Sequence, residues 1–197
     1  MVFYDIIPMI INFKRGFLMN KNNHLRNMIL AGLFLALAYV MPFLTGQIAA
    51  IGAMLCPLHI PVLLCGFICG WPWGLAVGFT APLLRSLTLS MPPLFPTAIC
   101  MAFELASYGA IAGLMHRLLP RKKPYIYCSL VMAMLVGRII WGIAMFVCIG
   151  VNGGSFTLTA FLAGAFTNAI PGIIVQLILI PILVMILDNP KIINVNE

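Results

Sequence analysis

Three charged side chains interrupt the long apolar stretches of the sequence, and they are the residues best suited to recognise a polar molecule. They are Arg85, Glu104 and Arg138. In a hydrocarbon environment a buried charge costs roughly 2.5–3.5 kcal/mol or more, so such residues are usually paired or functional. Arg85 and Glu104 flank a proline-rich turn at residues 91–96, which lets them face each other. We therefore expect a polar site near this turn.

Two aromatic residues are placed to join the same site. Tyr108 lies one helical turn after Glu104, and Trp141 lies three residues after Arg138. Residues at these spacings share a face of an α-helix. Each ring can therefore stack on a ligand, or it can simply pack in the core.

The remaining polar and reactive residues are less informative. His59, in an apolar segment with two prolines, is interpreted as a residue that hydrogen-bonds between helices. Of the two amides in the last apolar segment, Asn168 is preferred for the site, because Gln176 should lie near the cytoplasmic end. The cysteines are interpreted as small hydrophobic residues, not as metal ligands or redox groups, because they lie within apolar runs: Cys56, Cys65, Cys69, Cys100, Cys128 and Cys148.

The composition indicates an integral membrane protein. Of the 197 residues, 63% are hydrophobic and only 8% are charged. A soluble domain usually carries about 25% charged residues, so this chain has too few to keep a globular surface wet. The formal net charge of +7 does not indicate nucleic-acid binding, because the basic residues cluster in two loops instead of covering a face.

Six segments are long enough to cross a bilayer, which takes roughly 17–25 mainly apolar residues. They are residues 28–44, 48–69, 73–89, 95–115, 126–150 and 156–187. The last segment is too long for an upright helix, so it must tilt, kink at Pro171 or extend into the cytoplasm. The predicted fold class is therefore all-α, an integral membrane bundle of six transmembrane helices.

The basic residues orient this bundle. They precede the first segment and follow the fourth and the sixth, whereas the turns after the other segments carry no Lys or Arg. Cytoplasmic loops are enriched in these residues, so both termini are predicted to be cytoplasmic. Residues 1–26 then form a cytoplasmic N-terminal segment, in which 1–18 is an extension if Met19 is the true start. Residues 27–188 form the membrane domain and 189–197 a cytoplasmic tail.

The three buried charges are predicted to lie at one depth. A rise of about 1.5 Å per residue places Arg85 and Arg138 about 18 Å, and Glu104 about 16 Å, from the inner ends of their helices. If Arg85 pairs with Glu104, Arg138 has no acidic partner and should face water, backbone carbonyls or an anionic ligand. The alternative is that Glu104 bridges both arginines as a structural clamp. The sequence leaves both arrangements open.

Motifs of enzymes are missing from the sequence. It has no GxxxxGK[ST] loop, no HExxH and no paired acid motif of a membrane protease. We therefore expect no enzymatic activity, no cofactor and no bound metal. A chain with one site and no energy source of its own is expected to work with partners.

Small residues recur at a spacing of four, which lets helix backbones approach closely. The pairs are Gly32 and Ala36, Gly66 and Gly70, and Gly74 and Gly78.

The chain resembles the substrate-binding S components of energy-coupling-factor (ECF) vitamin transporters over about residues 25–188. Besides size and predicted topology, the resemblance rests on four runs: His59–Phe67 followed by Gly70, Gly74–Phe79, Pro82–Ser86 and Phe103–Gly109. It implies a protein of the prokaryotic cell membrane that binds a vitamin-like molecule from outside. It also implies partners, namely a transmembrane coupling subunit driven by two ATPases.

The resemblance implies site and docking residues as well. The family's site is built from helices four to six and the outer loops, which correspond here to Glu104, Tyr108, Arg138, Trp141, Asn152 and Asn168. Its docking surface uses small residues on the first helix, typically Ala-x-x-x-Ala, where this chain has Gly32-x-x-x-Ala36. Among the family's vitamins an extra cation favours an acid, and pantothenate is the first expectation. Folate, riboflavin and a queuosine precursor remain open.

Two other classes of function are considered. A stand-alone carrier or channel for a small organic anion, dimeric because it lacks an internal repeat, would transport without ATP or partners. A membrane-embedded enzyme or scaffold has no supporting motif.

Overall fold

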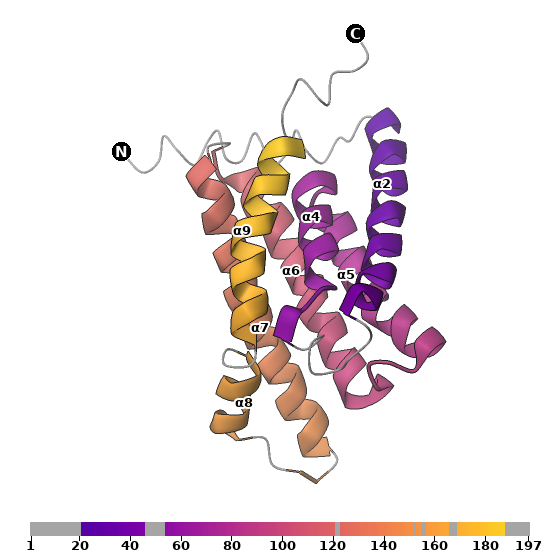
Figure 1. Cartoon of the computed structure of the whole chain (residues 1–197), viewed down its shortest axis with the longest axis vertical. Helices are drawn as coiled ribbons and strands as arrows, with labels where there is room; N and C mark the ends of the chain where they lie inside the picture. Colours follow the sequence, from indigo (N-terminus) through magenta and orange to yellow (C-terminus); the bar gives the residue numbers. More distant parts are fainter. Residues whose placement is uncertain are drawn as a thin grey trace.

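The computed structural model describes residues 21–45, 54–120, 123–151, 153–154, 157–165 and 169–187. This part of the chain is helical and contains no strand, which confirms the predicted all-α fold (Figure 1). The long elements are α2 (Lys21–Val40), α4 (His59–Cys69), α5 (Trp71–Leu89), α6 (Ile99–Leu118), α7 (Lys123–Val151), α8 (Leu158–Ala165) and α9 (Ile170–Leu187). Two short helical turns are η1 (Met41–Thr45), which continues α2, and η2 (Leu94–Ala98), which leads into α6.

Four stretches of the described residues are long and apolar enough to cross a membrane. They are His24–Phe43, Leu94–Leu118, Lys123–Val151 and Ile170–Leu187. The chain therefore has the architecture of a multi-pass membrane protein. The first turn of α2 and the last turn of α9 lie at the same end of the bundle, the upper end in Figure 1. The number of six spans and the cytoplasmic position of the termini remain predictions.

Two predicted spans differ from the helices observed. Within the described part, the segment predicted over 48–69 becomes a regular helix only at His59, because a turn closed by the hydrogen bond from His59 N to Cys56 O (3.0 Å) precedes it. The segment predicted over 156–187 is divided into α8 and α9. Pro171 is the second residue of α9, a position where its missing N–H breaks no helical hydrogen bond.

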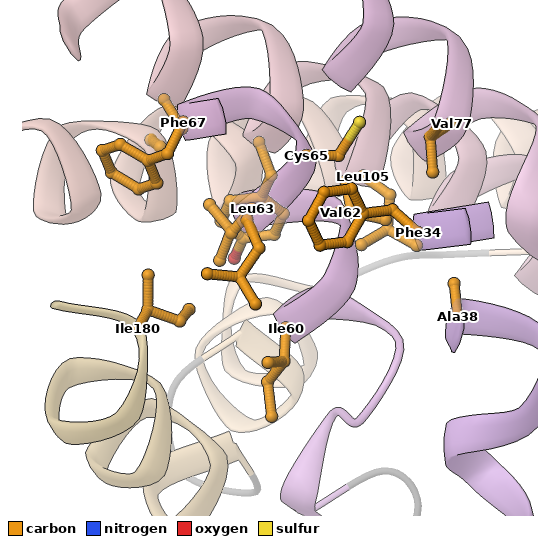
Figure 2. Packing of buried hydrophobic residues seen from close by; sticks show 14 of the residues in the cluster. Phe34, Ala38, Ile60, Val62, Leu63, Cys65, Phe67, Val77, Leu105 and Ile180 are labelled. Carbon is orange, nitrogen blue, oxygen red and sulfur yellow. The ribbon is translucent and has the colours of Figure 1, made fainter. Parts of the chain in front are cut away.

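The centre of the hydrophobic core is α4, in which ten of eleven residues are buried. A helix that is apolar on all sides is typically surrounded by other elements. Figure 2 shows Val62, Leu63 and Cys65 of this helix among side chains from α2, α6 and α9. This burial holds the first residue of α4, His59, inside the protein.

Glycines bring the backbones of α4, α5 and α6 into direct contact, as the small-residue spacing predicted. A Cβ atom on Gly74 would lie 2.6 Å from the carbonyl oxygen of Gly109, and one on Gly109 would overlap the carbonyl of Gly74. Similar overlaps involve Gly66 and Gly78. The three helices are therefore packed main chain against main chain, and this contact sets where the charged residues of α6 stand.

Candidate functional site

A buried ion pair joins α6 to α7. Nη1 of Arg138 lies 3.1 Å from Oε1 of Glu104, and the two residues are only 7% and 2% exposed. Glu104 is the sole acidic residue in the described part of the chain. These two predicted site residues therefore stand next to each other in the interior.

His59 belongs to the same cluster. Its Nε2 atom lies 3.6 Å from Oε1 of Glu104, and its ring meets the ring of Tyr108 edge-on at a centroid distance of 5.1 Å. The sequence interpretation left His59 out of the site. A histidine at the start of an otherwise apolar helix, two residues after Pro57, was the signal that could have included it.

A cavity of about 180 Å³ opens beside this cluster. Its polar wall contains His59, Glu104 and Arg138, and its apolar wall contains Met101, Trp141 and Met145. Residues of η2 and of the turn before α4 also line it, so the cavity lies in the half of the bundle away from the first turn of α2. The structure thus brings Glu104, Arg138 and Trp141 to one cavity, as predicted from the sequence.

The turn before α4 contributes a further residue that sequence reasoning assigned to plain packing. Sγ of Cys56 lies 4.0 Å from Nη2 of Arg138, and Cys56 lines the cavity. The cysteine has a positive φ of 48°. The sequence around Cys56 does not indicate this contact with Arg138, because the contact depends on the conformation of the turn before α4.

Trp141 is held against α8. Its indole stacks on the ring of Phe161, with centroids 6.3 Å apart and an angle of 28° between the planes. A Cβ atom on Gly164 would lie 2.7 Å from the edge of the indole, so this glycine leaves room for the ring. The indole that lines the cavity is therefore held in position by α8.

Tyr108 lies behind the cluster. It is fully buried, and its ring contacts both His59 and the site of Gly137, where an added Cβ would be 3.1 Å away. It packs against the back of the polar residues and does not line the cavity.

The contact between Arg85 and Glu104, expected both in the pair and in the clamp, was wrong. Nη1 of Arg85 donates a hydrogen bond to the carbonyl oxygen of Tyr39 (3.1 Å), and its guanidinium lies 5.5 Å from the centre of the Phe43 ring. The last carbonyls of a helix lack internal partners and carry partial negative charge, so the end of α2 satisfies this buried cation. Glu104 therefore pairs with Arg138, and Arg138 is not the unpaired cation that was expected.

The other predicted residues divide into two groups. Asn152 and Asn168 lie outside the described residues, as do the predicted terminal segments before Lys21 and after Leu187. Gly32 and Ala36 both lie on the exposed side of α2, whereas Phe34 and Ala38 face the core. An added Cβ on Gly32 would have no atom within 4 Å.

Two buried nitrogen atoms of the polar cluster lack a hydrogen-bond partner within the part of the chain that the structure describes. Nε of Arg138 and Nδ1 of His59 have no hydrogen-bond partner among the described residues. Buried polar atoms are normally hydrogen-bonded, so these two atoms, each with almost no exposed area, are an exception in the interior next to the cavity.

An apolar helical bundle with a mostly apolar cavity that a buried ion pair helps to line has the architecture of a multi-pass membrane protein with a polar site inside the described residues. Comparison with protein families gives the particular group. The model of the ECF transporter, substrate-specific component, matches residues 26–184. The chain therefore belongs to this family, as the sequence resemblance indicated. No curated protein and no solved structure matches the chain.

Proposed function

We propose that the chain captures a micronutrient, such as a vitamin or a vitamin precursor, in the cavity between α6 and α7. Membership of the substrate-specific family supports this function. The observation that carries the placement is the Glu104–Arg138 pair, which is buried and lines a cavity of about 180 Å³.

Stability alone is a poor reason for such a pair. Replacing a buried ion pair by apolar residues is often neutral or stabilising by about 1–4 kcal/mol, because two desolvated charges are costly. In a chain with only 8% charged residues, a pair beside a cavity favours ligand recognition over a structural role. His59 and Trp141 line the same cavity and add a polar ring and an apolar ring to its surroundings.

The proposed setting is the plasma membrane of a prokaryote, with six spans and both chain ends in the cytoplasm. The cavity then lies toward the outer side, because it is in the half of the bundle away from the first turn of α2. Delivery is proposed to depend on a coupling subunit and two ATPases. The small residues Gly32 and Ala36, exposed on α2, are the proposed contact with the coupling subunit. No catalytic step by this chain is proposed.

The Glu104–Arg138 pair changes what is expected for the charge of the substrate. Pantothenate was favoured because Arg138 was expected to be unpaired, and the Glu104–Arg138 pair removes that reason. Arg85 does not replace it, because its guanidinium is engaged by the Tyr39 carbonyl.

Native mass spectrometry of the gently extracted protein tests the proposed function. We expect about one small molecule per chain, and Arg138→Ala should lower this occupancy at least about tenfold, since a charge-assisted contact contributes about 1.5–3 kcal/mol. Arg26→Ala, which removes an exposed arginine of α2, is the matched control and should retain the molecule.

Two results would contradict the proposal. One is a protein that retains nothing and binds no member of a vitamin panel at micromolar concentration. The other is uptake by vesicles that contain this chain alone without ATP, which would favour the stand-alone carrier.

A further inference from the structure

The charged groups that line the cavity oppose each other in sign. One wall carries the carboxylate of Glu104 and the guanidinium of Arg138, with 3.1 Å between their nearest atoms. A ligand group within hydrogen-bonding reach of Arg138 is therefore also close to Glu104. A ligand carboxylate would be repelled by Glu104, and a ligand ammonium would be repelled by Arg138, with little water between them to screen either charge.

An uncharged group with a donor beside an acceptor avoids both repulsions. Arg138 has only donors and an ionised Glu104 has only acceptors, so the complementary ligand edge offers one acceptor and one donor side by side. His59 lines the same cavity, with its Nε2 atom 3.6 Å from Oε1 of Glu104. Its ring can donate or accept there, according to its tautomer.

Trp141 and the volume of the cavity limit the rest of the ligand. Trp141 lines the cavity and is stacked on Phe161, and aromatic rings favour offset stacking or edge-to-face contact with another ring. An engineered cavity of about 150 Å³ in another protein holds one benzene molecule. The cavity here, about 180 Å³, therefore suits one substituted ring more closely than a system of three fused rings.

We propose that the ligand binds through an uncharged donor–acceptor edge, such as a carboxamide, a lactam or an adjacent ring N–H and carbonyl, carried on a small ring that stacks on Trp141. The edge meets Glu104 and Arg138, with His59 as the third polar contact. This inference rests on the proposed function and narrows its substrate class to molecules that do not place a carboxylate on Arg138.

A matched pair of single-ring probes tests the charge preference. Nicotinamide and nicotinate differ in carrying a carboxamide or a carboxylate on the same ring, and their binding is measured by tryptophan fluorescence up to about 10 mM. We expect nicotinamide to bind at least about tenfold more tightly, which corresponds to about 1.4 kcal/mol. Glu104→Gln should reduce or reverse this preference, because it removes the negative charge while keeping the shape of the side chain.

Changes in probe binding in the variants Glu104→Gln and Arg138→Gln distinguish a ligand carboxamide on the ion pair from a ligand carboxylate on Arg138. With a carboxamide edge on the pair, Glu104→Gln and Arg138→Gln both weaken nicotinamide. With a carboxylate on Arg138, the original protein binds nicotinate at least as tightly as nicotinamide and Glu104→Gln leaves nicotinamide unweakened, and either result overturns the inference. Failure of both probes to bind the original protein overturns it as well. Far-UV circular dichroism and thermal melting establish that each variant is folded. If a single variant does not fold because one charge is left unpaired, the double variant Glu104→Gln/Arg138→Gln, in which both charges are removed, is used instead.

The molecule retained by the purified protein gives an independent reading. Its exact mass and fragmentation identify its functional groups. A retained acid without an uncharged donor–acceptor edge contradicts this inference but leaves the proposed function standing. A protein that retains nothing and binds no vitamin contradicts the proposed function itself.

Discussion

Gly109→Ala should destabilise the protein, although alanine is the better helix former. Gly109 of α6 faces Gly74 of α5, and an added methyl group would overlap the carbonyl of Gly74. The overlapped atoms are main-chain atoms, which cannot move aside as the end of a flexible side chain can. Relief therefore requires the two helices to separate, and this disturbs the face of α6 that carries Glu104 and Tyr108.

The magnitude follows from two opposing effects. Overpacking a well-packed interior costs typically 1–3 kcal/mol, and contact with the backbone places this site at about 3 kcal/mol. Alanine regains about 1 kcal/mol of helix propensity. We expect a net loss of about 2 kcal/mol, which for a chain of this length lowers the melting temperature by about 4–8 °C.

Thermal melting of the detergent-purified protein measures this loss, and Gly32→Ala is the matched control. Gly32 is also within a helix, but an added Cβ would have no atom within 4 Å. Its alanine variant should melt at the original temperature or slightly above it. If Gly109→Ala had the same melting temperature as Gly32→Ala, the main-chain contact between α5 and α6 would be refuted.

Two further predictions concern the surroundings of the site. Arg85→Gln loses the charge-assisted hydrogen bond to the Tyr39 carbonyl and the contact with the Phe43 ring, so thermal melting should show a loss of about 2 kcal/mol; an unchanged melting temperature would argue against this anchor. Gly164→Ala brings a methyl group against the Trp141 indole, so native mass spectrometry should show severalfold lower ligand occupancy and fluorescence a shifted emission. Unaltered occupancy and emission would mean that Trp141 is not positioned by α8.

The fold class could be predicted because it depends on composition and length. Few charges and long apolar runs leave helices as the economical way to satisfy backbone hydrogen bonds in lipid. The glycine spacing also indicated close packing, and the contacts of Gly66, Gly74 and Gly78 confirm it. The divided last segment was not foreseen in detail, since apolar composition alone does not say where a long run will break.

The level of the charged residues along their helices could be predicted from the sequence, but the neighbours that their side chains face could not. Counting residues placed Arg85, Glu104 and Arg138 at one level, and two of the three do meet. The count carries no information on how each helix is rotated about its axis or which neighbour it faces, so a contact between Arg85 and Glu104 was expected that the structure does not contain. His59 was missed for a related reason, because its depth depends on the turn that precedes α4.

The glycine contacts also bear on how the interior can open. Helices that touch main chain to main chain can neither slide nor roll past one another without atomic overlap, so α4, α5 and α6 behave as one stiff block. Breathing motions are then expected at the boundary between this block and α7, where longer side chains intervene. Because Glu104 and Arg138 stand on opposite sides of that boundary, a molecule that contacts both side chains from the cavity links the two sides.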